Sequence, residues 1–414
     1  MTVNSTPAKN WIAFFIGVFT SISVRAIGTF SISEILALAA LPFVGFSCLR
    51  NAQVKRFVVM IIVWLCGVII ADQYNDTPAI DAIKGSFNLI LFILIIPFIY
   101  WLMKDSIRRI MYYAAGAGIS GLIRYQFLYT HIDDWTDQII RTYMLVPAVF
   151  FMGYYLYYHG RKILSYIVLE GYAFWTLSHG SRYIFLMVTI GIFLLITINF
   201  LCKSAGWEAT QQKFRKRLFP IFIILGIAAI GASTTYTRLA SSGQLGDKAK
   251  DKYEIQSSAK NGLASGRTDF MISLYAISKN PIVGYGSYAK DDYGLTISYE
   301  EGASYWNTYK GRFTIDRYEM IPGHSYILGA WVYAGILGLV FWIYVIAVIL
   351  KFTMKYLCCY PRLLCYFVIT ICMMLWDIFF SPFANRLNFT MFIMPMLLMI
   401  NCRGPIDAKI RPCQ

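Results

Sequence analysis

The feature that most constrains this chain is a series of apolar segments, each about as long as a bilayer requires. A membrane-spanning helix needs roughly 20 mostly apolar residues, and fewer where it is kinked. Hydrophobic residues make up 58% of the chain and charged residues 14%, which is more apolar surface than a water-soluble globule can bury. The sequence therefore predicts an all-α polytopic integral membrane protein with about 12 transmembrane helices, over residues 11–24, 33–47, 57–71, 86–103, 110–123, 142–158, 163–178, 183–201, 218–235, 324–350, 356–376 and 387–402.

The distribution of basic residues predicts the orientation, because cytoplasmic loops of membrane proteins are enriched in Lys and Arg. One alternate set of connections carries twenty basic residues, whereas the other set, apart from one long loop, carries six. Both termini are therefore predicted to lie in the cytoplasm. The net charge of +15 is explained by these loops and does not indicate a nucleic-acid partner.

The long loop spans residues 236–323 and is predicted to lie outside, since long loops cross the membrane whatever their charge. It separates an N-terminal transmembrane bundle of about nine helices (1–235) from C-terminal transmembrane helices with a short cytoplasmic tail (324–414). A loop of this size usually has a function of its own. None of the nine cysteines falls in a predicted outer loop, so we expect no disulfide framework.

Three segments at the predicted outer face carry side chains suited to chemistry. Arg182 begins a span after a short outer turn, where it either binds an anion or snorkels to the interface. Arg267 projects from the first turn of a predicted amphipathic surface helix, whose free N–H groups favour phosphate; the alternative is a solvated arginine. His324 lies where the long loop re-enters the membrane, and is either a general base or a structural hydrogen-bonding group. Phosphate-loop, dinucleotide-fold and HExxH motifs are absent from the sequence, and no metal or cofactor is expected.

Taken together, these segments resemble a known family. His324-Ser325, nine residues, Gly335, two residues and Gly338 are similar to the His-Asn/Ser/Gln, x9, Gly-x-x-Gly signature of the bacterial O-antigen ligase and O-antigen polymerase superfamily. The segments SHGSRY and GRTDFMISLYAISKNPIVGYG resemble further blocks of that family, in the family's order. The resemblance implies a metal-independent glycosyltransferase of the bacterial inner membrane, with its active site facing the periplasm and a glycan on undecaprenyl diphosphate as its donor.

The resemblance also implies roles for the matching residues. Arg182 and Arg267 would hold the diphosphate, His324 would activate the acceptor hydroxyl, and Gly335 and Gly338 would form a structural motif. The acceptor would be another lipid-linked glycan in a polymerase, or lipid A-core in a ligase.

Within this family, the block IPGHSYILGAWVYAGILG and the later WDIFFSPF favour the polymerase, which would work beside a chain-length co-polymerase. A ligase that glycosylates proteins is a third relative. A transporter of lipid-linked glycans is the alternative from a different class of protein.

Overall fold

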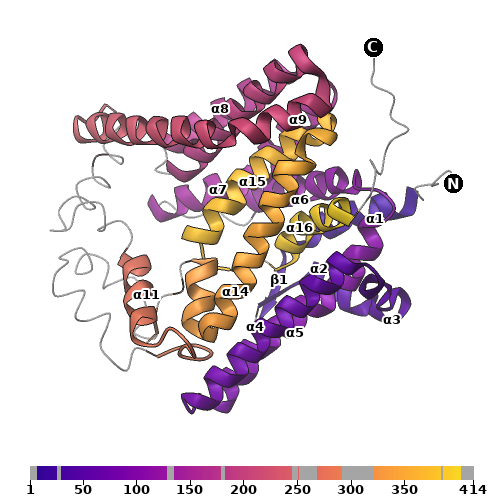
Figure 1. The fold of residues 1–414 in the computed structure, drawn as a ribbon, viewed down its shortest axis with the longest axis vertical. Helices are drawn as coiled ribbons and strands as arrows, with labels where there is room; N and C mark the ends of the chain where they lie inside the picture. The colour runs from indigo at the N-terminus through magenta and orange to yellow at the C-terminus, as the bar shows by residue number, and fades with distance from the viewer. Residues whose placement is uncertain are drawn as a thin grey trace.

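The computed structural model is built almost entirely of helices, and it describes residues 7–25, 29–127, 135–178, 182–244, 250, 268–290, 320–321, 323, 325–383 and 386–401 (Figure 1). Within those residues, five helical segments are long and apolar enough to cross a membrane: Ala52–Tyr74, Ala79–Met103, Tyr183–Cys202, Tyr326–Lys355 and Pro361–Phe380. A sixth, Arg386–Ile400, is apolar but shorter. The chain is therefore an α-helical membrane protein.

The core is centred on α4 (Ala52–Tyr74) and α14 (Tyr326–Lys355), which pack against each other; α5 (Ala79–Met103) packs on α4. Their interface is aromatic. Trp64 stacks on Phe341 with ring centroids 5.0 Å apart. Trp342 lies edge-on to both rings and is fully buried. Large rings that interlock in this way contribute both burial and specific geometry, so this cluster fixes how the central helices cross.

The other helices surround this centre in a simple order. The bounds are α1 (Pro7–Phe19), α6 (Arg109–Phe127), α7 (Trp135–Tyr158), α8 (Lys162–Ser178), α9 (Arg182–Ser241), α11 (Thr268–Lys279), α15 (Leu364–Phe380) and α16 (Arg386–Asn401). α1 packs on α6, and α6 to α9 each pack on the next, while α15 packs on both α9 and α14. The start of α1 and the end of α16 lie on one side of the molecule, and α11 and the start of α14 lie on the other (Figure 1).

The N-terminal region departs from the predicted pattern. The run 33–47, predicted as one span, folds as α2 (Ile32–Ala39), α3 (Leu41–Val44) and the 3-10 helix η1 (Ser47–Arg50). Pro42 lies at the start of α3, and Gly45, with φ of 61°, ends it. An eight-residue helix is only about 12 Å long, which is too short to cross a bilayer.

A two-stranded antiparallel ribbon precedes α2, so the described fold is not purely helical. It consists of β1 (Ser23–Arg25) and β2 (Thr29–Ser31). The ribbon leads directly into α2, which begins with a capping box between Ser31 and Glu34. Short 3-10 helices η4 (Leu357–Cys359) and η5 (Pro361–Leu363) connect α14 to α15.

The predicted spans 183–201 and 218–235 both lie in α9, a single helical element of 60 residues. The connection predicted between them is helical as well. Within it, the Gln211 amide donates a hydrogen bond to the Thr353 carbonyl at 2.9 Å and accepts one from the Cys358 N–H at 2.8 Å. This part of α9 therefore fastens the end of α14 that is remote from the predicted site.

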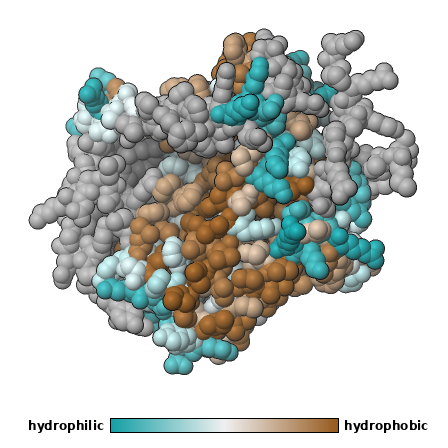
Figure 2. Space-filling view, in the orientation of Figure 1, coloured by the Kyte–Doolittle hydropathy of each residue, from teal (hydrophilic) through white to brown (hydrophobic). Residues whose placement is uncertain are grey.

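The surface of the central helices is apolar over a broad face (Figure 2). Ile62 and Ile70 of α4 and Ile343 of α14 are between 43% and 52% exposed. In Figure 2 this brown face lies between teal patches of hydrophilic residues at its right and lower edges. A contiguous apolar surface of this kind is unfavourable in water and is stable against lipid.

Candidate functional site

The structure describes some of the predicted site residues and leaves others outside its range. Arg267 and His324 lie outside the described residues. Arg182 is the first residue of α9, and its backbone alone is described. Gly335 and Gly338 both lie in α14.

The described neighbours of all three candidate residues meet at one place, the last turn of α15. Tyr183, next to Arg182, stacks on Trp376 with ring centroids 5.8 Å apart. Ser325, next to His324, donates a hydrogen bond from its hydroxyl to the Ile378 carbonyl at 3.0 Å.

The third segment reaches the same turn through α11. Phe270, three residues after Arg267, lies with its ring centroid 5.7 Å from that of Phe380. Three segments far apart in the sequence are thus held against residues 376–380.

Asp377 occupies the centre of this turn. Its Oδ1 accepts a hydrogen bond from the Ser381 hydroxyl at 2.7 Å. An ionisable side chain inside an apolar span is expensive to bury and is a candidate for function. The place where the three segments meet therefore holds one described carboxylate.

The start of α14 is folded back at Gly335. This residue has φ of 58° and ψ of −150°, which is not helical, so α14 is two helical pieces joined at a kink. A residue with a Cβ adopts such angles only under strain. The kink brings the two pieces close together: a Cβ added to Gly338 would lie 2.1 Å from the Ala330 carbonyl oxygen. The two glycines of the predicted motif therefore make the fold-back possible.

A segment that follows α11 docks onto this kink, and we call residues 281–290 the strap. The Tyr285 N–H donates to the Val332 carbonyl at 2.7 Å, and the Gly286 N–H donates to the Tyr333 carbonyl at 3.1 Å. In return, the Ile336 N–H donates to a strap carbonyl, that of Ile282, at 3.0 Å. The kink frees backbone groups from the helix, and the strap satisfies them.

The approach of the strap is close enough to require a glycine on the strap as well. Gly284 has φ of 82°, and a Cβ there would lie 2.5 Å from the Gly335 nitrogen. The Gly284 carbonyl accepts hydrogen bonds from the amides of Asn280 and Asn75, at 2.7 and 3.1 Å. These bonds fix the strap to the end of α4 as well as to α14.

Asp72 of α4 fastens the next residues of the strap. It is buried, and its two oxygens accept hydrogen bonds from the Ser287 N–H at 2.5 Å and the Ser287 hydroxyl at 2.8 Å. Bonds to a carboxylate are stronger than those between neutral groups. The strap thus connects the segment after Arg267, the kink after His324 and the end of α4.

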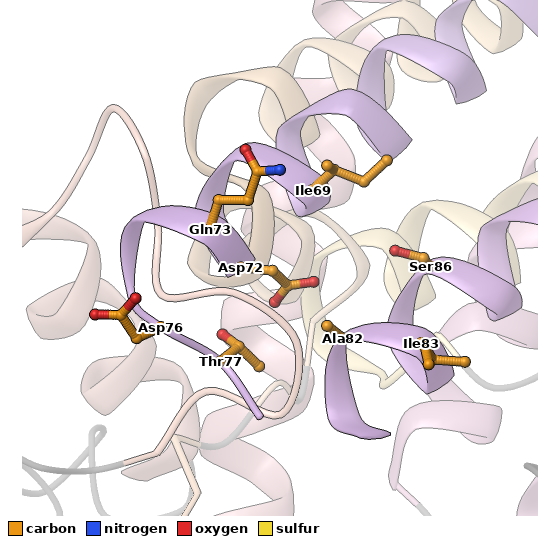
Figure 3. Close-up of a pocket in the computed structure, with 8 residues that line it drawn as sticks. All are labelled: Ile69, Asp72, Gln73, Asp76, Thr77, Ala82, Ile83 and Ser86. Atoms are coloured by element: carbon orange, nitrogen blue, oxygen red, sulfur yellow. The ribbon is translucent and has the colours of Figure 1, made fainter. Parts of the chain in front are cut away.

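A cavity of about 580 Å³ opens beside this clamp, between the end of α4 and the start of α5 (Figure 3). Its polar lining comes from Asp72, Gln73, Asp76, Thr77 and Ser86. Apolar residues complete the wall on both helices: Ile69, Ala82 and Ile83.

No group of three or more His, Cys, Asp or Glu side chains suited to a metal ion occurs among the described residues. No protein-family model, curated protein or solved structure matches this chain.

Neither Asp377 nor Asp72 is among the site residues predicted from the sequence. The sequence does contain a pattern that indicates Asp377: it is the one charged residue in the apolar segment LCYFVITICMMLWDIFF. Asp72 carries no comparable signal, because its role depends on Ser287, which is 215 residues away in the sequence.

Proposed function

We propose that this protein is a membrane glycosyltransferase that transfers a glycan from undecaprenyl diphosphate to a hydroxyl group in the assembly of a bacterial surface polysaccharide. One observation carries the proposal. The described neighbours of Arg182, Arg267 and His324 contact the same turn of α15, at residues 376–380. Residues that act on one substrate must be close together, and this convergence favours a shared site.

The chemistry assigns a task to each residue. The acceptor oxygen attacks the anomeric carbon, the bond from that carbon to the diphosphate oxygen breaks, and undecaprenyl diphosphate leaves. His324 takes the proton from the acceptor hydroxyl. Arg182 and Arg267 neutralise the charge that gathers on the departing diphosphate, through bidentate hydrogen bonds. A single base on the face opposite the leaving group predicts inversion at the anomeric carbon.

The proposal includes a topology of about 12 spans in the bacterial inner membrane, with both termini in the cytoplasm and residues 236–323 in the periplasm. The twenty-to-six asymmetry of basic residues supports it. The opposite positions of the start of α1 and of α11 agree with it (Figure 1). Reporter fusions after Lys252 and after Arg411 test it: we expect periplasmic and cytoplasmic signals respectively, and the reverse pattern would remove the site assignment.

The central experiment measures polysaccharide made by variants expressed at equal levels. Arg182→Ala and Arg267→Ala should abolish the ladder on a gel, and lysine should restore it only in part because it lacks the planar fork. His324→Ala should bind the lipid-linked donor normally and turn over about 10²–10⁴ times more slowly. Matched controls are Arg238→Ala in the last turn of α9 and His159→Ala, both exposed in the structure.

Two outcomes would contradict the proposal. Normal ladders from the arginine variants would remove the diphosphate site. Normal turnover by His324→Ala, or a loss of donor binding together with turnover, would exclude His324 as the general base.

The polymerase and the ligase differ in their acceptor, and we favour the polymerase. Purified enzyme supplied with lipid-linked repeat units alone should lengthen the glycan. Transfer to lipid A-core instead would assign a ligase. Movement of the lipid-linked glycan across a vesicle membrane without new glycosidic bonds would assign the transporter.

A further inference from the structure

The cavity between α4 and α5 is lined by polar side chains whose hydrogen-bonding groups are available to a ligand. The side chains of Gln73, Asp76, Thr77 and Ser86 make no hydrogen bond within the part of the chain that the structure describes. Figure 3 shows Gln73 on α4, Ser86 on α5, and Asp76 and Thr77 on the turn between these helices. A cavity that presents amide, hydroxyl and carboxylate groups together matches a ligand rich in hydroxyls.

The charge of the cavity restricts the ligand further. Both charged residues in its lining, Asp72 and Asp76, are acidic. An anion such as a diphosphate would be repelled, whereas sugar hydroxyls donate well to carboxylates. Ile69 and Ile83 add apolar surface for the carbon faces of a sugar ring. The volume of about 580 Å³ is in the range of small-ligand sites.

The cavity is joined to the proposed catalytic end by the strap. Asp72 lies in its wall and holds Ser287 of the strap. Four residues earlier, Val283 lies at the kink, where a Cβ on Gly335 would come within 2.5 Å of its carbonyl carbon. A ligand in the cavity therefore lies beside the element that connects the segments of Arg267 and His324.

We infer that this cavity binds the hydroxyl groups of the acceptor saccharide. This inference rests on the proposed glycosyl transfer. Gln73 and Ser86 contact neutral hydroxyls, and Asp76 accepts hydrogen bonds from them. The diphosphate of the donor occupies the arginine side instead.

Binding can be measured without turnover. The probe is the oligosaccharide released by mild acid from the source cell's lipid-linked glycan, observed by saturation-transfer NMR with full-length protein in detergent. Wild type should transfer saturation to the sugar protons, and Ser86→Trp, which fills the cavity, should reduce the signal about tenfold. The control Ile80→Trp adds the same ring in the first turn of α5, where Ile80 is 68% exposed and lies outside the cavity.

Steady-state kinetics provide the second measurement. Gln73→Ala removes one exposed amide that supports no part of the fold, so the protein should remain folded. Its KM for the acceptor should rise about threefold to tenfold, the effect of one hydrogen bond, while its KM for the donor stays unchanged.

The outcomes separate this inference from the proposed function. One outcome is that the wild-type protein is active and that Ser86→Trp and Gln73→Ala keep its KM for the acceptor. The cavity is then not the acceptor site, although the assignment as a glycosyltransferase stands. Equal NMR signals from wild type and Ser86→Trp would overturn the inference as well. If wild type transfers no glycan at all, the proposed function fails, and a signal lost only in Ser86→Trp still identifies a saccharide site.

Discussion

Gly335→Ala should detach the strap from α14. A Cβ at this position would lie 1.9 Å from the Ile282 carbonyl oxygen and 2.5 Å from two backbone carbons, and backbone cannot move aside as a flexible side chain can. The three backbone hydrogen bonds between the strap and the kink would be lost. At roughly 0.5–1.5 kcal/mol each, this loss amounts to about 1.5–4.5 kcal/mol.

Two measurements on detergent-purified protein test this prediction. The midpoint of thermal unfolding, followed by size-exclusion chromatography, should fall by a few degrees. Trypsin should cleave faster after Lys279, which precedes the strap, and after Lys290, which is its last residue. Gly171→Ala is the matched control, because Gly171 lies in α8 with no heavy atom within 4 Å of an added Cβ. Wild-type melting and wild-type cleavage rates in Gly335→Ala would refute the argument that the kink needs a glycine.

Three further predictions concern other contacts. Arg386→Ala should lower the free energy of unfolding by about 3–5 kcal/mol in denaturant titrations, because the buried Glu34 carboxylate, 3.0 Å away, would lose its positively charged partner; an unchanged midpoint would contradict this. Burial raises the pKa of the Asp105 carboxyl, but the hydrogen bond and charge of Lys9, 2.6 Å away, outweigh it and hold that pKa below its usual value. The stabilisation is therefore complete above the unfolded pKa of about 4 and is lost as pH falls through the folded pKa, so Asp105→Asn should lower the melting midpoint near neutral pH and not in acid. Asp377→Asn should reduce the polysaccharide ladder at unchanged protein level, since it removes a charge beside the proposed site; a full ladder would exclude a role for that charge.

The sequence predicted the helical membrane class because that information is local. A run such as Ala79–Met103 is apolar throughout, and its length alone indicates a span. The run 33–47 misled the prediction because its apolar content is similar, while Pro42 and Gly45 divide it into helices too short to span. Hydropathy measures transfer to lipid and does not register these local backbone effects.

The candidate site was predictable in part. Gly335 stood out in the sequence through its spacing from His324, but the spacing carried no reason for a glycine. The reason is a contact with Ile282, 53 residues earlier, whose carbonyl leaves no room for a Cβ. Likewise, the pairing of Asp72 with Ser287 depends on how α4 and the strap pack, which no local pattern records.

The attachment of the strap to α14 has a consequence for how this region tolerates change. It is made mainly by main-chain groups, so the identity of the exposed strap side chains is of little importance; Ile282, for example, is 70% exposed. The length of the strap, in contrast, is constrained. Deleting one residue between 281 and 284 would shift the register and bring a side chain to the position at which Gly284 approaches the Gly335 nitrogen. Substitutions should therefore be tolerated at the exposed strap positions, where a deletion or an insertion of a single residue is not.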